Sequence, residues 1–180
     1  MPTEPALEVT LERVVEWQAA SDGHTAAEAS HELLVTLRAI EASLALEGGG
    51  EAGTLSRIEA KLDLLLLMAT QTGSPGNPLA GATTMVRLSP DGIAWQAAAP
   101  LPTAGARLRL MLQLDPRAPV VLRLPAQVVS VVEGPQSLLP EHLFEVTARF
   151  VGLDEAAQDA LSAAVFRLHR RALQPKRAPG

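Results

Sequence analysis

Hydrophobic side chains in the first quarter of the chain recur at spacings of three and four residues, the period of an amphipathic helix. One such stripe comprises Leu7, Leu11 and Val14 and continues at the polar Gln18, and a second comprises Leu33, Leu37, Ile40 and Leu44. Between them, Thr25 and Glu28 have the spacing of a capping box, which marks a helix start. Three glycines at 48–50 end the second stripe, because glycine is costly in a helix. We therefore predict N-terminal helices over residues 1–48.

A heptad pattern follows over residues 52–72, where apolar side chains alternate at spacings of three and four. Its seam comprises Leu55, Ile58, Leu62, Leu65 and Ala69. Leu64, Leu66 and Leu67 add apolar surface outside the seam, so this helix needs cover on more than one side. The pattern favours an oligomerisation helix, although packing against the two helices of the same chain would also cover it.

Residues 73–82 are rich in proline and glycine and predict a linker. Beyond it, over residues 83–173, the period changes to two, which is typical of strands with one buried face. We expect strands at 85–88, 93–97, 108–114, 122–129 and 144–150, with Ser89–Gly92 as the turn between the first two. Pro125 within the fourth strand indicates a sheet edge or a bulge.

A last helix is predicted after Asp154, a residue suited to the N-cap. Its apolar face comprises Ala157, Leu161, Ala164, Val165 and Leu168, and we expect residues 174–180 to be a disordered tail. Successive strands without intervening helices favour an antiparallel barrel or sandwich capped by this helix. The fold class is therefore α+β, with a helical first half.

Charge and composition narrow the function. The 180-residue chain has a formal net charge of −5, and its second half, with 11 Lys and Arg against 8 Asp and Glu, is too weakly basic to bind a nucleic-acid polymer. It has no cysteine, which excludes disulfides and thiolate metal sites. The N-terminus lacks the pattern of a secretory signal, and the densest apolar stretch, 64–69, is too short to span a bilayer. We expect a soluble cytoplasmic protein without membrane insertion.

No catalytic, metal or cofactor motif is present. The four histidines form no metal-binding pair, and the sequence has no phosphate-binding loop or nucleophile elbow. We predict that the protein is not an enzyme, with a hydrolase as the remote alternative. The basic cluster of Arg167, Arg170, Arg171, Lys176 and Arg177 is a candidate surface for an anion or an acidic partner; alternatively, it only complements the dipole of its own helix.

Two stretches resemble a known family. They are Val86–Trp95 with its continuation through 100–112, and Phe144–Phe150 with the helix of 153–171. Together they resemble a PilZ domain over about residues 78–173. The resemblance implies a six-stranded antiparallel β-barrel and, in many members, a receptor for the second messenger cyclic di-GMP. The usual ligand site combines an R-x-x-x-R segment before the first strand with a D/N-x-S-x-x-G turn.

The sequence departs from that ligand site at both places. No Lys or Arg lies between Lys61 and Arg87, and Arg87 occupies the Asp or Asn position of the turn. Ser89, Asp91 and Gly92 complete a candidate remnant of the turn, or serve as plain turn residues. We predict no cyclic di-GMP binding by the usual mode. The alternative is a true receptor with a non-standard site that uses Arg87, Arg149, Arg170 or Arg171.

The heptad stretch Leu55–Leu67 is similar to the helix through which a divergent PilZ subgroup self-associates. The resemblance implies a homo-oligomer, a tetramer or a dimer. It also implies a regulatory protein of cyclic di-GMP-related signalling that acts through a signalling protein partner, which the sequence does not identify.

Overall fold

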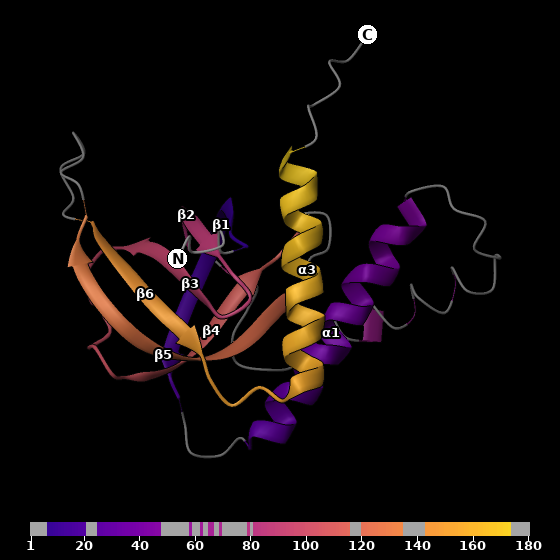
Figure 1. Cartoon of the computed structure of the whole chain (residues 1–180), viewed down its shortest axis with the longest axis horizontal. Coiled ribbons are helices and arrows are strands. Elements are labelled where there is room, and N and C mark those ends of the chain that lie inside the picture. The colour runs from indigo at the N-terminus through magenta and orange to yellow at the C-terminus, as the bar shows by residue number, and fades with distance from the viewer. Residues whose placement is uncertain are drawn as a thin grey trace, which may run out of the picture.

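The computed structural model describes residues 7–20, 25–47, 81–115, 120–134 and 143–173, and the single residues 58, 62, 65, 66, 69 and 79. Six strands form one closed barrel in the order β1-β2-β3-β6-β5-β4, and every neighbouring pair is antiparallel. They are β1 (Val9–Ala19), β2 (Thr83–Leu88), β3 (Gly92–Ala97), β4 (Arg107–Gln113), β5 (Val121–Glu133) and β6 (Phe144–Phe150). Two helices, α1 (Ala26–Glu47) and α3 (Glu155–Leu173), cross beside the barrel (Figure 1). The predicted six-stranded barrel with a closing helix is confirmed.

The barrel core follows the predicted alternation. On β4 and β5 every second side chain is buried, namely Leu108, Leu110, Leu112, Leu122, Leu124, Ala126 and Val128. The residues between them lie on the outer face, where they are partly or fully exposed. Because the sheet is closed, it has no edge strand, and each strand pairs with another on both sides over at least part of its length.

The prediction of helices throughout residues 1–48 is wrong for its first part. Residues 9–19 form β1, which pairs with β2 through Val9–Val14 and with β4 through Val15–Ala19. This strand closes the barrel, so the barrel domain does not begin at residue 83. The helical prediction holds from Ala26 onward.

Arg13 explains why the strand resembled a helix. The core-facing positions of β1 are Val9, Leu11, Val15 and Trp17, and Leu7 before the strand continues this alternation, which only Arg13 interrupts. The Arg13 side chain is accommodated because its Nε donates a hydrogen bond to the Leu114 carbonyl oxygen, at 3.1 Å. Burial lowers the pKa of Arg13, and the negative charges of Asp115 and Glu12 oppose that shift.

Both helices begin with the predicted caps. The Thr25 backbone N–H donates to Glu28 Oε2 (2.8 Å) and the Glu28 N–H to Thr25 Oγ1 (3.2 Å), which is a complete capping box. At the start of α3, Asp154 Oδ1 accepts the Ala157 N–H at 2.8 Å. The Asp154 N–H in turn donates to Ser30 Oγ of α1 at 2.9 Å, which joins the two helices.

The helices and the barrel share one hydrophobic core. The α1 side chains Leu33, Leu37 and Ile40 and the α3 side chains Ala157, Leu161, Ala164 and Val165 belong to the same buried cluster as the strands. The predicted apolar faces are thus confirmed for these residues. The side chain of Leu44, most of the predicted linker 73–82 and the predicted tail 174–180 lie outside the described residues. No helix in the described part of the chain is long and apolar enough to cross a membrane.

Pro125 fits β5 without a bulge of its own. It lies opposite Arg109 of β4, and on its other side its carbonyl oxygen accepts the Val151 N–H at 3.0 Å, just beyond the end of β6. Proline is tolerated where a neighbouring strand has ended. The register shift of the β5–β6 pair lies further along, between Val128 and Ser130.

Candidate binding surfaces

The turn between β2 and β3 is closed by hydrogen bonds of its own residues. The Ser89 N–H donates to the Gly92 carbonyl oxygen at 2.9 Å. Ser89 Oγ also donates to that oxygen and accepts the Gly92 N–H, both at 3.1 Å. The serine hydroxyl therefore serves the turn as donor and as acceptor.

Gly92 is required by the packing of β3 on β6. A Cβ atom added at Gly92 would lie 2.5 Å from the carbonyl oxygen of Ala148, a backbone atom that cannot turn away. The neighbouring turn residues are held as well. The Asp91 carbonyl oxygen accepts the Phe150 N–H at 2.8 Å, and Gln158 Nε2 of α3 donates to the Pro90 carbonyl oxygen at 2.7 Å. Gln158, which the sequence did not single out, thus attaches the turn to α3.

The two arginines nearest this turn have partners on other strands, and the partner of Arg87 lies two strands away, across β3. Arg87 forms an ion pair with Glu145 of β6 at 2.7 Å, with 44% and 40% of the two side chains exposed. Arg149 donates to Gln127 Oε1 of β5 at 2.7 Å. Both partners lie on outer faces of the barrel and were not predicted. Since the pair is exposed, its contribution to stability is small.

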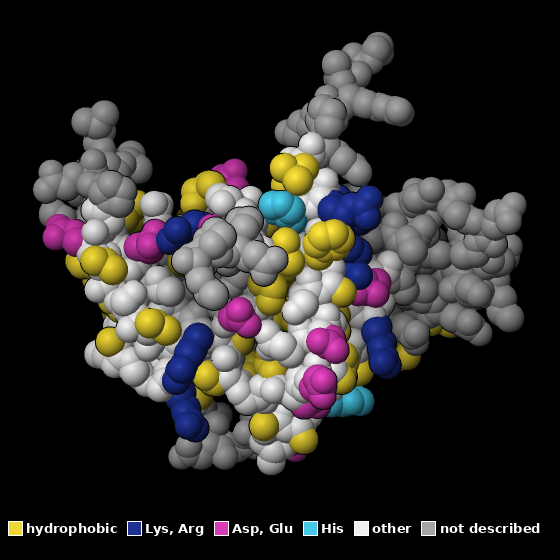
Figure 2. All heavy atoms as spheres, in the orientation of Figure 1, with side chains coloured by type: hydrophobic (Ala, Val, Ile, Leu, Met, Phe, Trp, Pro, Cys, Tyr) yellow, Lys and Arg dark blue, Asp and Glu magenta, His cyan; other side chains and the backbone are white. Residues whose placement is uncertain are grey.

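The predicted basic cluster on α3 is divided among three different contacts. Arg167 forms an ion pair with Glu41 of α1, and Arg171 forms one with Asp115 at 3.0 Å. Arg170 instead lies over the ring of Phe166, 6.0 Å from its centroid. On the face seen in Figure 2, basic side chains near the C-terminal end of α3 lie next to hydrophobic ones. Lys176 and Arg177 are outside the described residues.

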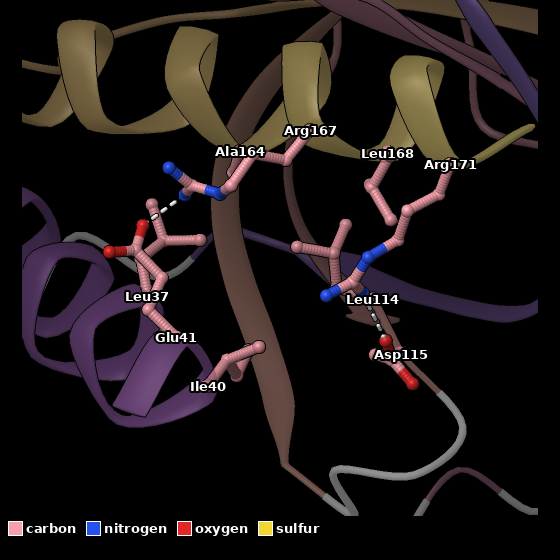
Figure 3. A pocket seen from close by; sticks show the side chains of 9 residues that line it. All are labelled: Leu37, Ile40, Glu41, Leu114, Asp115, Ala164, Arg167, Leu168 and Arg171. Atoms are coloured by element: carbon pink, nitrogen blue, oxygen red, sulfur yellow. Dashed lines mark hydrogen bonds and ion pairs between the residues drawn. The ribbon is translucent and has the colours of Figure 1, made fainter. Parts of the chain in front are cut away.

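Arg167 and Arg171 border a cavity of about 300 Å³ between α1, α3 and the end of β4. Figure 3 shows their guanidinium groups directed at Glu41 and Asp115. The apolar lining comes from both helices and from the residue after β4, and comprises Leu37, Ile40, Leu114, Ala164 and Leu168. Asp115 is almost completely buried, so its charge is held within the fold.

The predicted seam residues are described as single helical positions. Ile58, Leu62, Leu65 and Ala69 are helical and exposed, as is the neighbouring Leu66, whereas Leu55 lies outside the described residues. The exposed fractions of Ile58, Leu62, Leu65 and Leu66 range from 50% to 64%. Large apolar side chains with this exposure are typical of interaction surfaces when they gather in one place.

Comparison with known proteins places the chain in a family. The model of the family described as "Atypical PilZ domain, cyclic di-GMP receptor" matches residues 34–178. The chain belongs to the atypical PilZ domain family. The matched range of this PilZ chain begins within α1 and leaves out β1, although that strand closes the barrel.

Two solved PilZ structures are similar to the chain. One is a pathogenic protein from Xanthomonas campestris, described as a new tetrameric PilZ domain self-assembled via an unusual helical bundle. It is 29% identical, with a TM-score of 0.68 over 95% of this chain and 92% of that one. The other, the PilZ domain of Escherichia coli YcgR with cyclic di-GMP, is 21% identical, with a TM-score of 0.40 over 51% and 76% of the two chains. No curated protein matches the chain.

Residues of metal-binding type do not gather in the part of this PilZ chain that the structure describes. Among the described residues, no group of three or more His, Asp or Glu side chains is placed to hold a metal ion. His169 uses Nδ1 in a hydrogen bond with the Glu8 carbonyl oxygen at 2.9 Å, which joins α3 to the segment before β1.

Proposed function

We propose that this PilZ protein is a non-catalytic regulatory adaptor in bacterial cyclic di-GMP-related signalling, which self-associates through its helical segment and acts through a protein partner. The observation that carries the proposal is that the residues of the candidate ligand turn, and the arginines near it, already bind other residues of the protein. Ser89 and Gly92 bind each other, and Arg87 and Arg149 are held by Glu145 and Gln127.

Binding of cyclic di-GMP by the usual mode would require cationic donors directed at its two phosphates. The segment between Lys61 and Arg87 contains no Lys or Arg to supply them. Arg87 would also have to leave Glu145, and that carboxylate would then lie beside the anionic ligand. The remaining turn residues are explained by the packing of the turn, which supports recognition of proteins rather than of this dinucleotide.

Self-association is supported by the exposed apolar positions on the helical segment. A monomer would leave Ile58, Leu62 and Leu65 half exposed or more, whereas a helical bundle buries residues at this spacing. The similar protein from Xanthomonas campestris is a tetramer assembled via a helical bundle. We infer a tetramer for this chain as well, in preference to a dimer.

Light scattering on the full chain tests the assembly. We expect a particle of about four times the 19.0 kDa chain mass. The double variant Leu62→Glu/Leu65→Glu places charges in the seam and should dissociate it. Leu173→Glu, which makes the same change at a position 69% exposed on α3, should leave the mass unchanged. A 19.0 kDa particle for the unmodified chain would contradict self-association.

Titration calorimetry with cyclic di-GMP on the same full chain tests the ligand. We expect no binding at micromolar concentrations, because no free guanidinium pair faces the turn among the described residues. A micromolar or tighter dissociation constant would instead support the alternative, a receptor with a non-standard site. The family's description as a cyclic di-GMP receptor favours that alternative. Loss of the binding in Arg170→Gln/Arg171→Gln would then locate its site on α3.

A further inference from the structure

A second cavity, of about 410 Å³, lies between the outer face of β4 and β5 and the amino-terminal end of α1. Three arginines line it, Arg107 and Arg109 from β4 and Arg123 from β5. Arg107 and Arg109 are two residues apart on the same face of one strand. Arg123 lies opposite Met111, the next outward position of β4, so it is a diagonal neighbour of Arg109. The register of two strands thus gathers three guanidinium groups at one concave surface.

Among the residues that the structure describes, the positive charges in this cavity are only partly balanced. Glu32 is the acidic residue in its lining, and it forms an ion pair with Arg123 at 2.8 Å. The side chains of Arg107 and Arg109 have no ion pair or hydrogen bond within the described part of the chain. In this they differ from Arg87, Arg149 and Arg171, each of which has a polar partner. Two adjacent cations thus face the cavity without a partner from the described ranges.

The start of α1 adds to the positive potential. Thr25, Ala26, Ala29 and Glu32 line the cavity, so the first turns of the helix form its wall. The capping box uses the N–H groups of Thr25 and Glu28. By helix geometry the N–H groups of the first turn between them have no intrahelical acceptor, and the dipole makes this end of the helix attractive to anions.

We propose that this cavity binds a small phosphate monoester, with Arg107 and Arg109 as the residues that hold the phosphate oxygens. Two unpaired guanidinium groups match the nearly doubly negative charge of a monoester, and their fork geometry suits phosphate oxygens. The volume is within the range of small-molecule sites and leaves room for an organic group beside the phosphate. The site is separate from the Ser89–Gly92 turn and does not depend on self-association.

Thermal unfolding of the full chain with inorganic phosphate or AMP as probe tests the site. A ligand that binds only the native state raises the melting temperature in a saturable way. We expect such a rise at low ionic strength, and its loss with added salt. Calorimetry should show that AMP binds the unmodified chain. The double variant Arg107→Gln/Arg109→Gln should raise the dissociation constant by about tenfold or more, since charge-assisted hydrogen bonds are lost.

Two matched variants keep the test specific. Arg38→Gln removes an exposed arginine of α1 that does not line the cavity, and it should bind AMP as the unmodified chain does. Arg109→Lys keeps the charge without the fork and should retain part of the affinity. Absence of any rise up to about 10 mM probe would overturn the proposal. So would equal affinity of the double variant and the unmodified chain, or a response to the diester cyclic di-GMP without one to the monoesters.

Discussion

Replacement of Gly92 by alanine separates a packing role from a ligand role at the β2–β3 turn. In PilZ receptors the glycine of this turn belongs to the ligand motif, as the resemblance implies, so a glycine kept for a ligand alone would tolerate alanine without loss of stability. In this structure the added Cβ would lie 2.5 Å from the Ala148 carbonyl oxygen. An ordinary contact begins at 3.4 Å, so the two strands must separate by roughly the difference.

The expected cost follows from what that movement disturbs. Ala148 pairs with Ile93 of β3 and with Val128 of β5, so its carbonyl group cannot move without distorting two strand pairs. The two hydrogen bonds between the Ser89 hydroxyl and the Gly92 backbone would also be distorted. Overpacking of this kind, together with weakened hydrogen bonds, costs about 2–4 kcal/mol. For a chain of this size each kcal/mol lowers the melting temperature by about 2–4 °C, so we expect a decrease of about 5–15 °C.

The assay is thermal unfolding of the unmodified chain and the variant at equal protein concentration, because oligomerisation makes the melting temperature depend on concentration. Gly81→Ala is the matched control. Its added Cβ would meet Val14 Cγ1 at 3.3 Å, a side-chain atom that can adjust, and we expect a change below about 1 kcal/mol. If Gly92→Ala melts within about 2 °C of the unmodified chain, the packing argument is refuted and a ligand role for the glycine regains support.

Three further predictions concern stability. Thr36 is buried and its Oγ1 has no hydrogen-bond partner in the described part of the chain. Thr36→Val, which keeps the shape, should therefore raise the free energy of unfolding by about 1 kcal/mol in urea denaturation; a decrease would show that the hydroxyl is satisfied. Asp154→Ala removes the α3 cap and should cost about 1 kcal/mol in the same assay, whereas Asp154→Asn or Asp154→Ser should recover most of it. A fragment of residues 34–178 lacks β1 and exposes the edges of β2 and β4, so it should aggregate or fail to give a cooperative transition; a fragment that unfolds cooperatively as a monomer would show that β1 is dispensable.

Much of the barrel could be predicted because apolar and polar residues alternate within the sequence of each single strand. Leu108, Leu110 and Leu112 are buried on β4, as their spacing predicted. The β2–β3 turn and the caps of α1 and α3 could likewise be predicted, since each is formed by residues within a few positions of one another. Local hydrogen-bonding chemistry and local periodicity are properties of the sequence alone.

The strand β1 could not be recognised because its evidence is distant in the sequence. Leu7, Leu11 and Val15 fit both a period of two and a spacing of four, and Arg13 occupies the position that would have decided between them. The hydrogen bond that accommodates Arg13 goes to Leu114, 101 residues away. The strand could therefore not be recognised from the sequence, because the charged Arg13 stands in a core-facing position and its hydrogen-bond partner is known only from the fold.

For the same reason, the sequence could not predict which residues of the candidate site are available to a ligand. Arg87 and Arg149 were identified from their residue type, but their availability depends on Glu145 and Gln127, which only the strand register brings near. Arg107 and Arg109 are indicated by the sequence only as outward positions of an alternating strand, and nothing in the pattern shows that they lack a partner among the described residues. Cross-strand neighbours decide whether such a cation is neutralised, and a sequence does not state them.

The place of β1 in the barrel changes how the helical segment relates to the rest of the molecule. Because β1 precedes α1 and β2 follows residue 82, the helical positions 58–69 lie in an excursion between two adjacent strands of one barrel. They are not a separate unit ahead of it. Each end of that excursion joins a packed element, α1 on one side, whose residues Leu33, Leu37 and Ile40 belong to the common core, and β2 on the other. Two connections restrict the position of a barrel relative to its helical segment more than a single flexible linker would. If the segment forms the bundle, the barrels should therefore keep a defined arrangement around it. Binding at the α1 wall of the cavity lined by Arg107 and Arg109 would then act on the helix that precedes this segment in the chain.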